Sequence, residues 1–81
     1  MSWRVRFTVR AARDLDRLPD PDRRVILAAV RAFAAGAIAD VKKLKGRSDY
    51  RLRVGRWRVL YALNAGELIV LRILDRKEAY R

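Results

Sequence analysis

The chain has 81 residues, with 20 Lys and Arg against 9 Asp and Glu, so its net charge is +11 at pH 7. This length predicts a single domain over residues 1–81 with a small core. The sequence contains no Cys and no His, which excludes disulfides, thiolate or imidazole metal sites and catalysis by histidine. We therefore expect neither a metal nor a cofactor.

The positive charge is concentrated in the second half of the chain. Residues 1–40 hold eight basic and five acidic residues, whereas residues 41–81 hold twelve and four. Such an excess predicts a polyanionic partner, either nucleic acid or an acidic protein segment, although solubility alone is an alternative reason for it. Apolar runs are too short to span a membrane and the start MSWRVRF lacks the apolar core of a signal peptide. We expect a cytoplasmic protein with no membrane partner.

The first forty residues predict a strand followed by two helices. Residues 3–9 alternate apolar and polar side chains, which is typical of a half-buried strand. Residues 11–18 favour a short helix that Pro19 ends, and residues 19–36 favour a longer one with Asp20 as N-cap. The apolar stripe predicted for the longer helix consists of Val25, Ile26, Ala29, Val30 and Phe33. The two helices should form a hairpin.

From Tyr50 onward the apolar period becomes two. Strands are predicted over 50–54, 57–63 and 67–74, joined by a turn at Gly55-Arg56 and a loop over 64–66. The last strand is almost wholly apolar, which favours a central position covered on both faces. The order β-α-α-β-β-β predicts an α+β fold: a twisted, mainly antiparallel four-stranded sheet with a helical hairpin packed on one face.

Three arginines in the predicted strands should share the face opposite the helices. Arg51 and Arg53 alternate with apolar residues on one strand, and Arg58 lies on its neighbour, so the three side chains should be about 5–8 Å apart. Like charges opposite one another destabilise a sheet. A phosphodiester would relieve this repulsion, because guanidinium groups bind phosphate oxygens in pairs. The alternative is three solvated arginines.

Further basic residues flank this cluster. Lys42, Lys43 and Lys45 precede the strands, and Arg56 lies in the turn between two of them. These four side chains are candidates for contacts with an RNA backbone, and a solvated loop is an equal alternative for the lysines. The tail after the last strand adds Arg76 and Tyr80, whose phenol can stack on a base or exchange a proton.

The pattern LKG…YRLRVGRWRVLYAL…GELIVLRILDRKEAYR, after the β-α-α start, resembles the RelE/ParE superfamily of toxins from type II toxin–antitoxin pairs. The resemblance to the RelE branch implies a ribosome-dependent endoribonuclease that cuts mRNA in the ribosomal A site, with rRNA contacts and a cognate antitoxin as partner. The catalytic residues that it implies are Arg51, Arg53, Arg58, Arg76 and Tyr80. The ParE branch, which inhibits DNA gyrase, is one alternative, and an inactive nucleic-acid-binding relative is another.

The sequence departs from the RelE pattern where protons must move. Active relatives commonly have Lys at the positions of Arg51 and Arg53, and arginine does not release its proton at neutral pH. Many relatives also have Gly-His where this chain has Leu74-Asp75. The implied reaction is attack of a ribose 2′-OH on the adjacent phosphorus, and Tyr80 is the predicted proton-transfer residue. Asp75 could instead orient Arg76 or accept the proton. With so weak an acid–base set, we expect much of the rate to come from substrate positioning by the ribosome.

Overall fold

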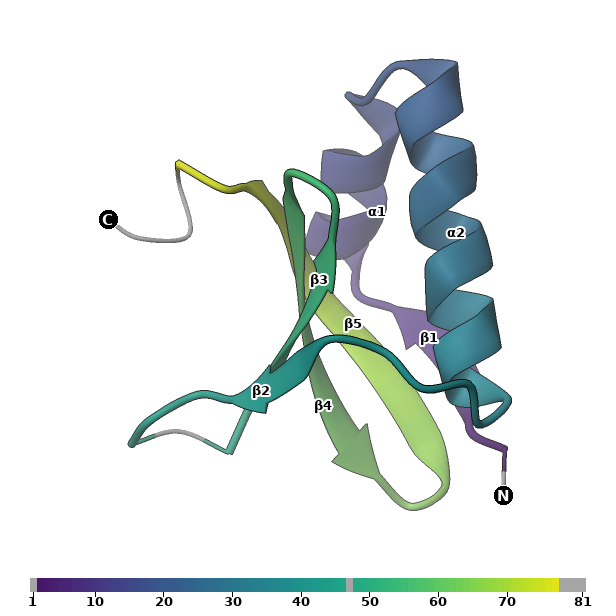
Figure 1. The fold of residues 1–81 in the computed structure, drawn as a ribbon, viewed down its shortest axis with the longest axis vertical. Coiled ribbons are helices and arrows are strands. Elements are labelled where there is room, and N and C mark those ends of the chain that lie inside the picture. Colours follow the sequence, from purple (N-terminus) through teal and green to yellow (C-terminus); the bar gives the residue numbers. More distant parts are fainter. Residues whose placement is uncertain (1, 47, 78–81) are drawn as a thin grey trace.

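The structure is a computed structural model that describes residues 2–46 and 48–77. Five strands form one sheet in the order β1-β5-β4-β3-β2, and two helices cover one face of it (Figure 1). The elements are β1 (Arg4–Phe7), α1 (Val9–Asp16), α2 (Asp20–Ala34), β2 (Val41–Lys43), β3 (Tyr50–Val54), β4 (Trp57–Asn64) and β5 (Glu67–Asp75). Among the strand pairs of the described residues, β1–β5 is parallel and the other three are antiparallel. The predicted α+β fold, with a mainly antiparallel sheet and a helical hairpin on one face, is confirmed.

The sheet has one strand more than predicted. The lysine run that was expected to form a loop contains β2, whose register pairs Val41 with Leu52 and Lys43 with Tyr50. All three residues of β2 are exposed. Because burial on one face is what produces an alternating pattern, a three-residue strand without a buried residue gives no such pattern in the sequence.

The first strand is shorter than predicted, because Thr8 begins a helix. The Thr8 hydroxyl accepts a hydrogen bond from Ala11 N (3.1 Å) and donates one to Leu71 O (3.1 Å). A threonine in this N-cap position stabilises the first helical turn. Helix α1 thus begins at Val9 rather than residue 11 and ends at Asp16 rather than residue 18. The prediction for Val9 was wrong: it is helical and 71% exposed, not part of the apolar face of β1.

Helix α2 lies within the predicted range but begins differently. Pro19 occupies the N-cap position, and Asp20, predicted to be the cap, is the first helical residue. The buried positions are Ile26, Val30 and Ala34, spaced four residues apart. Val25 was predicted to belong to this stripe, but it lies about 100° around the helix from Ile26 and is 58% exposed.

The core lies between the helices and the sheet. Its buried residues are Ala11, Ile26, Val30, Ala34, Leu52, Val54, Val59, Tyr61, Leu68, Val70 and Ile73. The ring of Tyr61 stacks on Tyr50 with 5.4 Å between centroids and meets Phe33 edge-on at 5.5 Å. Burial, with a smaller contribution from Tyr50, raises the pKa of Tyr61 to about 12. Tyr61 is therefore a neutral core residue at physiological pH.

Strand β5 occupies the central position that its apolar sequence predicts, between β1 and β4. The prediction that both of its faces are covered was wrong. Leu68, Val70 and Ile73 face the helices and are buried, whereas Ile69 and Leu71 lie outside the core and are half-buried. The register shifts at Leu60/Tyr61, where Leu60 pairs with Arg72 and Tyr61 with Val70, so Leu71 is the extra residue of a β-bulge.

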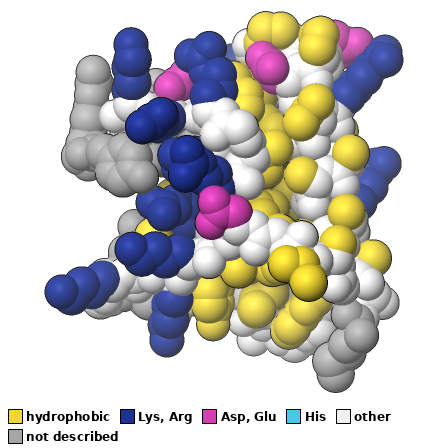
Figure 2. Space-filling model, viewed as in Figure 1, with side chains coloured by type: hydrophobic (Ala, Val, Ile, Leu, Met, Phe, Trp, Pro, Cys, Tyr) yellow, Lys and Arg dark blue, Asp and Glu magenta, His cyan; other side chains and the backbone are white. Residues whose placement is uncertain are grey.

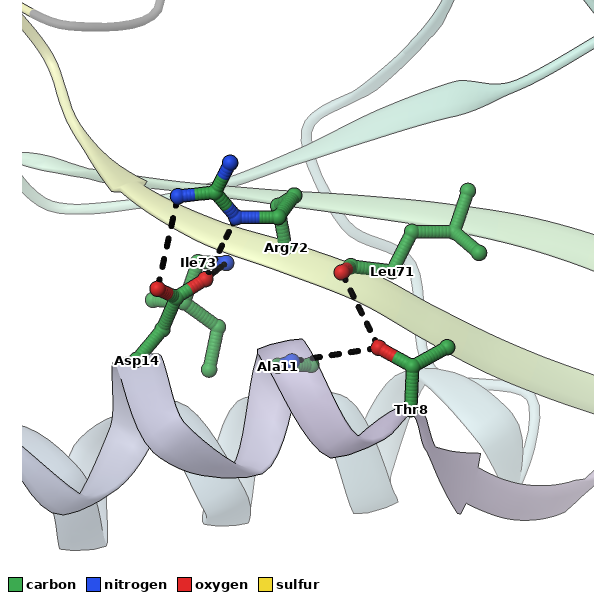
Figure 3. A network of polar contacts seen from close by, with 6 residues as sticks. All are labelled: Thr8, Ala11, Asp14, Leu71, Arg72 and Ile73. Carbon is green, nitrogen blue, oxygen red and sulfur yellow. Dashed lines mark hydrogen bonds and ion pairs between the residues drawn. The ribbon is translucent and has the colours of Figure 1, made fainter.

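Asp14 connects α1 to β5 just beyond the end of β1 (Figure 3). Its Oδ2 accepts hydrogen bonds from Arg72 Nε (2.8 Å) and from Ile73 N (3.0 Å), and its Oδ1 accepts one from Arg72 Nη2 (3.4 Å). Burial alone would raise the pKa of Asp14, but the hydrogen bonds from Arg72 and Ile73 and the charges of Arg72 and Arg10 outweigh it, so this pKa is lowered. Helix α1 thereby fixes the half of β5 that leads to the tail.

Candidate nucleic-acid interface

The strand register gathers basic residues on the face of the sheet opposite the helices. Lys42 of β2 lies directly opposite Arg51 of β3, and Arg53 lies opposite Arg58 of β4. These residues alternate along their strands with the buried Leu52, Val54 and Val59, so they share the open face. Figure 2 shows Lys and Arg side chains gathered on the side of β2 and β3, away from the apolar surface of α2. We call Lys42, Arg51 and Arg53 the basic row.

Arg58 is on the predicted face but is not accessible. Its side chain is only 1% exposed, and its Nη1 donates to Gly55 O and Trp57 O, both at 3.2 Å. The expectation that Arg58 is part of an open floor of the site is therefore corrected. Its guanidinium supports the β3–β4 turn by donating these hydrogen bonds to two backbone carbonyls. Arg58 therefore offers no accessible cation on the open face.

The lysines of the 42–45 run do not all face the same way. Lys43 lies opposite Tyr50, one residue out of phase with Lys42, and so belongs to the other face of the sheet. Lys42, Lys43 and Lys45 nevertheless line one open surface pocket of about 660 Å³, together with Leu44, Gly46 and Ser48. This pocket is lined by residues of β2 and of the β2–β3 connection, three of them lysines.

Arg56 and Asp75 join the β3–β4 turn to the start of the tail. Arg56 Nε donates to Asp75 Oδ2 (3.0 Å), Arg56 Nη2 bonds the same oxygen, and the guanidinium lies 5.2 Å from the centre of the Trp57 ring. Asp75 Oδ1 also accepts from Lys77 N (3.1 Å), while Arg76 N donates to Arg56 O (2.8 Å). Arg56, predicted to bind RNA, is therefore occupied by a carboxylate, because the β4–β5 register brings Asp75 opposite Trp57.

These contacts also decide what Asp75 can do. The Lys77 amide, followed by the Arg56 side chain, lowers the pKa of Asp75. A carboxylate with a lowered pKa is a poor proton acceptor. Asp75 accepts from the Arg56 side chain and the Lys77 amide, and its predicted role in orienting Arg76 stays a prediction. Arg76 begins the tail beside the turn and is exposed. The predicted role of Tyr80 falls outside the described residues.

The sequence reading missed a second basic surface. Arg10, Arg13 and Arg17 of α1 and its C-cap line an open pocket of about 380 Å³ with Val9, Asp14 and Arg72. The spacing of these three arginines, i, i+3 and i+7, places them on one side of a helix, and it could have indicated this surface from the sequence. Arg72 could not be assigned to this surface, because its contact with Asp14 joins residues 58 positions apart.

The part of the chain that the structure describes was also searched for groups of metal ligands and for membrane-spanning helices. No group of three or more acidic residues there is placed to hold a metal ion. Neither of its helices has the length and apolar character that crossing a bilayer requires.

Chains from three solved toxin–antitoxin complexes are similar to this one. One comes from the RelB–RelE complex of Methanococcus jannaschii, with 28% identity, 93% of this chain and 94% of that chain covered, and a TM-score of 0.76. Another comes from the RelE–RelB complex of Pyrococcus horikoshii, with 27% identity, 94% of this chain and 97% of that chain covered, and a TM-score of 0.78. The third is from the RelBE2 complex of Mycobacterium tuberculosis, with 32% identity, 94% of this chain and 100% of that chain covered, and a TM-score of 0.65. A search of curated proteins found no match.

The sequence profile of the ParE toxin of type II toxin–antitoxin systems, parDE, matches residues 5–80. The match runs from the first strand into the tail and so includes the helices, the basic row and the Arg56–Asp75 pair. The resemblance noted in the sequence to the RelE/ParE superfamily is confirmed. The chain therefore belongs to the family of ParE toxins of type II toxin–antitoxin systems.

Proposed function

We propose that this toxin is an endoribonuclease that cleaves mRNA on the ribosome. In the proposed reaction the ribose 2′-oxygen forms a bond to the adjacent phosphorus while the bond to the 5′-oxygen breaks. The 2′-OH loses its proton and the leaving 5′-oxygen gains one, which gives a 2′,3′-cyclic phosphate and a 5′-OH. The observation that carries this proposal is the basic row on an open sheet face. The likeness to chains from RelE complexes, at 27–32% identity, supports the RelE-like activity.

The basic row suits a phosphodiester whose negative charge grows during the reaction. Lys42 and Arg51 are directly opposite neighbours, so their Cβ atoms are about 4.5–5.5 Å apart, and Arg53 follows two residues along β3. An anion beside the row would place its oxygens against guanidinium groups, whose fork geometry matches phosphate. Donors held in this way stabilise the transition state, because they are already oriented when the charge develops.

Proton transfer is the part of the reaction that the two arginines of the row do not supply. Arginine keeps its proton at neutral pH, Tyr61 is buried with a raised pKa, and the lowered pKa of Asp75 makes it a poor base. We propose Tyr80 for this role, as the sequence predicts. Because the proton-transfer groups are weak, substrate positioning by the ribosome would supply most of the rate enhancement. Holding the reacting groups in the right geometry lowers the activation free energy.

A purified translation system tests the proposal. Wild-type protein should cut ribosome-bound message and leave naked message intact, and Arg51→Gln and Arg53→Gln should each reduce the cleavage rate on the order of 100-fold. Arg24→Gln and Arg31→Gln are matched controls, because they remove the same charge from exposed positions of α2. Intact message, or equal cleavage by the basic-row variants and the controls, would overturn the proposal.

A second candidate is inhibition of DNA gyrase without ribonuclease activity. Two observations favour it: the matching profile is that of ParE, and Arg58, one of the implied catalytic residues, is buried. This candidate predicts that the protein blocks gyrase-dependent supercoiling of a relaxed plasmid at concentrations that leave ribosome-bound message uncut. Unchanged supercoiling in the presence of the toxin would exclude it.

A further inference from the structure

Three arginines lie on one side of α1, away from the basic row. Arg10, Arg13 and Arg17 occupy positions i, i+3 and i+7, the last of them at the C-cap, and all three are exposed. Residues with this spacing are neighbours on a helix surface, and the helix rises about 10.5 Å from the first to the last. They line the open pocket of about 380 Å³ described above. We call these three residues the α1 arginines.

The stability of the fold does not account for the α1 arginines. Like charges three or four residues apart repel one another on a helix, so Arg13 is repelled by both of the others. Arg17 suits the C-terminal end of the helix dipole, but Arg10 lies in the first turn, where the dipole disfavours a cation. None of the three forms an ion pair with another residue that the structure describes. Their charges are available to an anion from outside the chain.

Asp14 lies beside these arginines but does not neutralise them. Its carboxylate points toward β5, where it accepts from the side chain of Arg72 and from Ile73 N (Figure 3). The Asp14 side chain is only 10% exposed. The acidic group in this pocket is thus used within the fold, and the solvent side of the pocket stays positive.

The α1 arginines and the basic row lie on opposite sides of the sheet. Helix α1 packs over β5 and β1 on the covered face, whereas the basic row belongs to β2 and β3 on the open face (Figure 1). An RNA strand held by the basic row would have to pass around the edge of the sheet to reach α1. The α1 arginines therefore suit a second polyanion.

We infer that the α1 arginines bind the phosphate backbone of paired RNA, so that the protein holds message on one face and a second RNA on the other. This inference rests on the proposed function in one respect, because a toxin that works on the ribosome meets paired RNA rather than DNA. Guanidinium groups match phosphate oxygens in pairs of hydrogen bonds. A helix packed on the sheet presents three such groups in a fixed row.

The lining of the pocket favours a duplex over a single strand or an acidic peptide. None of its described lining residues is aromatic, and unpaired bases gain affinity by stacking on aromatic side chains. Paired RNA hides its bases and offers phosphates and 2′-hydroxyls instead. An acidic peptide would need apolar contacts in addition to charge, and among the described lining residues only Val9 supplies a large apolar side chain.

Fluorescence anisotropy with a blunt-ended RNA duplex tests the inference. If each α1 arginine neutralises one phosphate, Arg10→Gln, Arg13→Gln and Arg17→Gln should each weaken binding about fivefold at about 0.15 M salt, and the triple variant on the order of 100-fold. Each single variant should also lower the slope of log affinity against log salt concentration by about 1. Arg31→Gln is the matched control, because it removes the same charge from an exposed position of α2, and it should bind nearly as wild type.

Two further measurements locate the site and separate binding from folding. A single-stranded RNA at a concentration that saturates the basic row should not displace the duplex, and Arg53→Gln should weaken binding of the single strand but not of the duplex. Arg13→Gln should leave Tm unchanged or raise it, because it removes a repelled charge. In the ribosome assay the α1 variants should raise KM rather than lower kcat, since they remove binding that does not change in the transition state.

Several outcomes would overturn the inference: equal weakening of duplex binding by Arg31→Gln, displacement of the duplex by the single strand or by an equal concentration of a Glu-rich peptide, or tighter binding of a DNA duplex of the same sequence. These results would leave the cleavage assay unaffected. Conversely, duplex binding by the α1 arginines in a protein that cuts no message would refute the proposed ribonuclease and leave this second RNA surface in place.

Discussion

Replacing Asp14 should destabilise the fold more than replacing any other surface acid of α1. Its carboxylate holds both Arg72 and the amide of Ile73 at the point where β5 loses β1 as a neighbour. The side chain of Asp14 is 10% exposed and that of Arg72 is 30% exposed. Asp14→Ala leaves the Ile73 amide without this acceptor. Asp14→Asn keeps a hydrogen-bonding oxygen but loses the charge.

The size of the effect follows from these contacts. A hydrogen bond to a charged group contributes about 1.5–3 kcal/mol, while a partly exposed ion pair adds about 0–1 kcal/mol. We expect Asp14→Ala to lower the free energy of unfolding by about 2–3 kcal/mol and Asp14→Asn by about 1 kcal/mol. For a domain of this size, Asp14→Ala should lower Tm by about 10–20 °C.

Urea unfolding at two pH values checks both the size and the cause. The pKa of Asp14 is lowered in the folded state, so its stabilisation is present above the unfolded pKa near 4 and is lost as pH falls through the folded value. The difference between wild type and Asp14→Ala should be full at pH 7 and smaller at pH 3. Asp16→Ala, at an exposed position of the same helix, is the control. A loss for Asp14→Ala within about 0.5 kcal/mol of this control would refute the reasoning.

Three other substitutions test separate parts of the structure. Thr8→Ala removes the N-cap of α1 and the bond to Leu71 and should cost about 1 kcal/mol in urea unfolding; no loss would show that the cap is dispensable. Ile26→Ala opens a cavity at a fully buried position and should cost about 2–5 kcal/mol, whereas Val25→Ala next to it should stay within about 0.5 kcal/mol. Asp75→Asn should speed amide exchange at Lys77 several-fold, because it weakens the acceptor. In the wild type the same amide should lose protection as pH falls through the lowered pKa of Asp75, and pH-independent protection would contradict its assignment.

The parts of the fold that sequence predicts best are those in which burial repeats at a fixed period. The three strands of the second half place apolar residues on the helix-facing side at every second position, apart from the bulge at Leu71, and α2 buries Ile26, Val30 and Ala34 four residues apart. Strand β2 has no buried residue, so no period marks it. The parallel pairing of β1 with β5 joins the two ends of the chain, and local sequence patterns hold no information about it.

For the candidate site, alternation predicts the face of a side chain but not its exposure. Arg51 and Arg53 lie on the open face, as the period requires, and the β2–β3 register adds Lys42. The burial of Arg58 depends on backbone carbonyls of the turn at Gly55 and Trp57, and the occupation of Arg56 depends on Asp75, 19 residues away. The Arg56–Asp75 contact is tertiary, while the Arg58 contacts are local but depend on which of several directions the long side chain takes.

Mapping of mRNA 5′ ends in cells after induced expression tests the central claim most directly, namely that the basic row cleaves message. Wild-type toxin should produce new 5′-OH ends within translated regions. Arg53→Gln should abolish them, and Arg31→Gln, which removes an equal charge from α2, should not. Intact message in growth-arrested cells, accompanied by altered plasmid supercoiling, would contradict the claim and identify gyrase as the target.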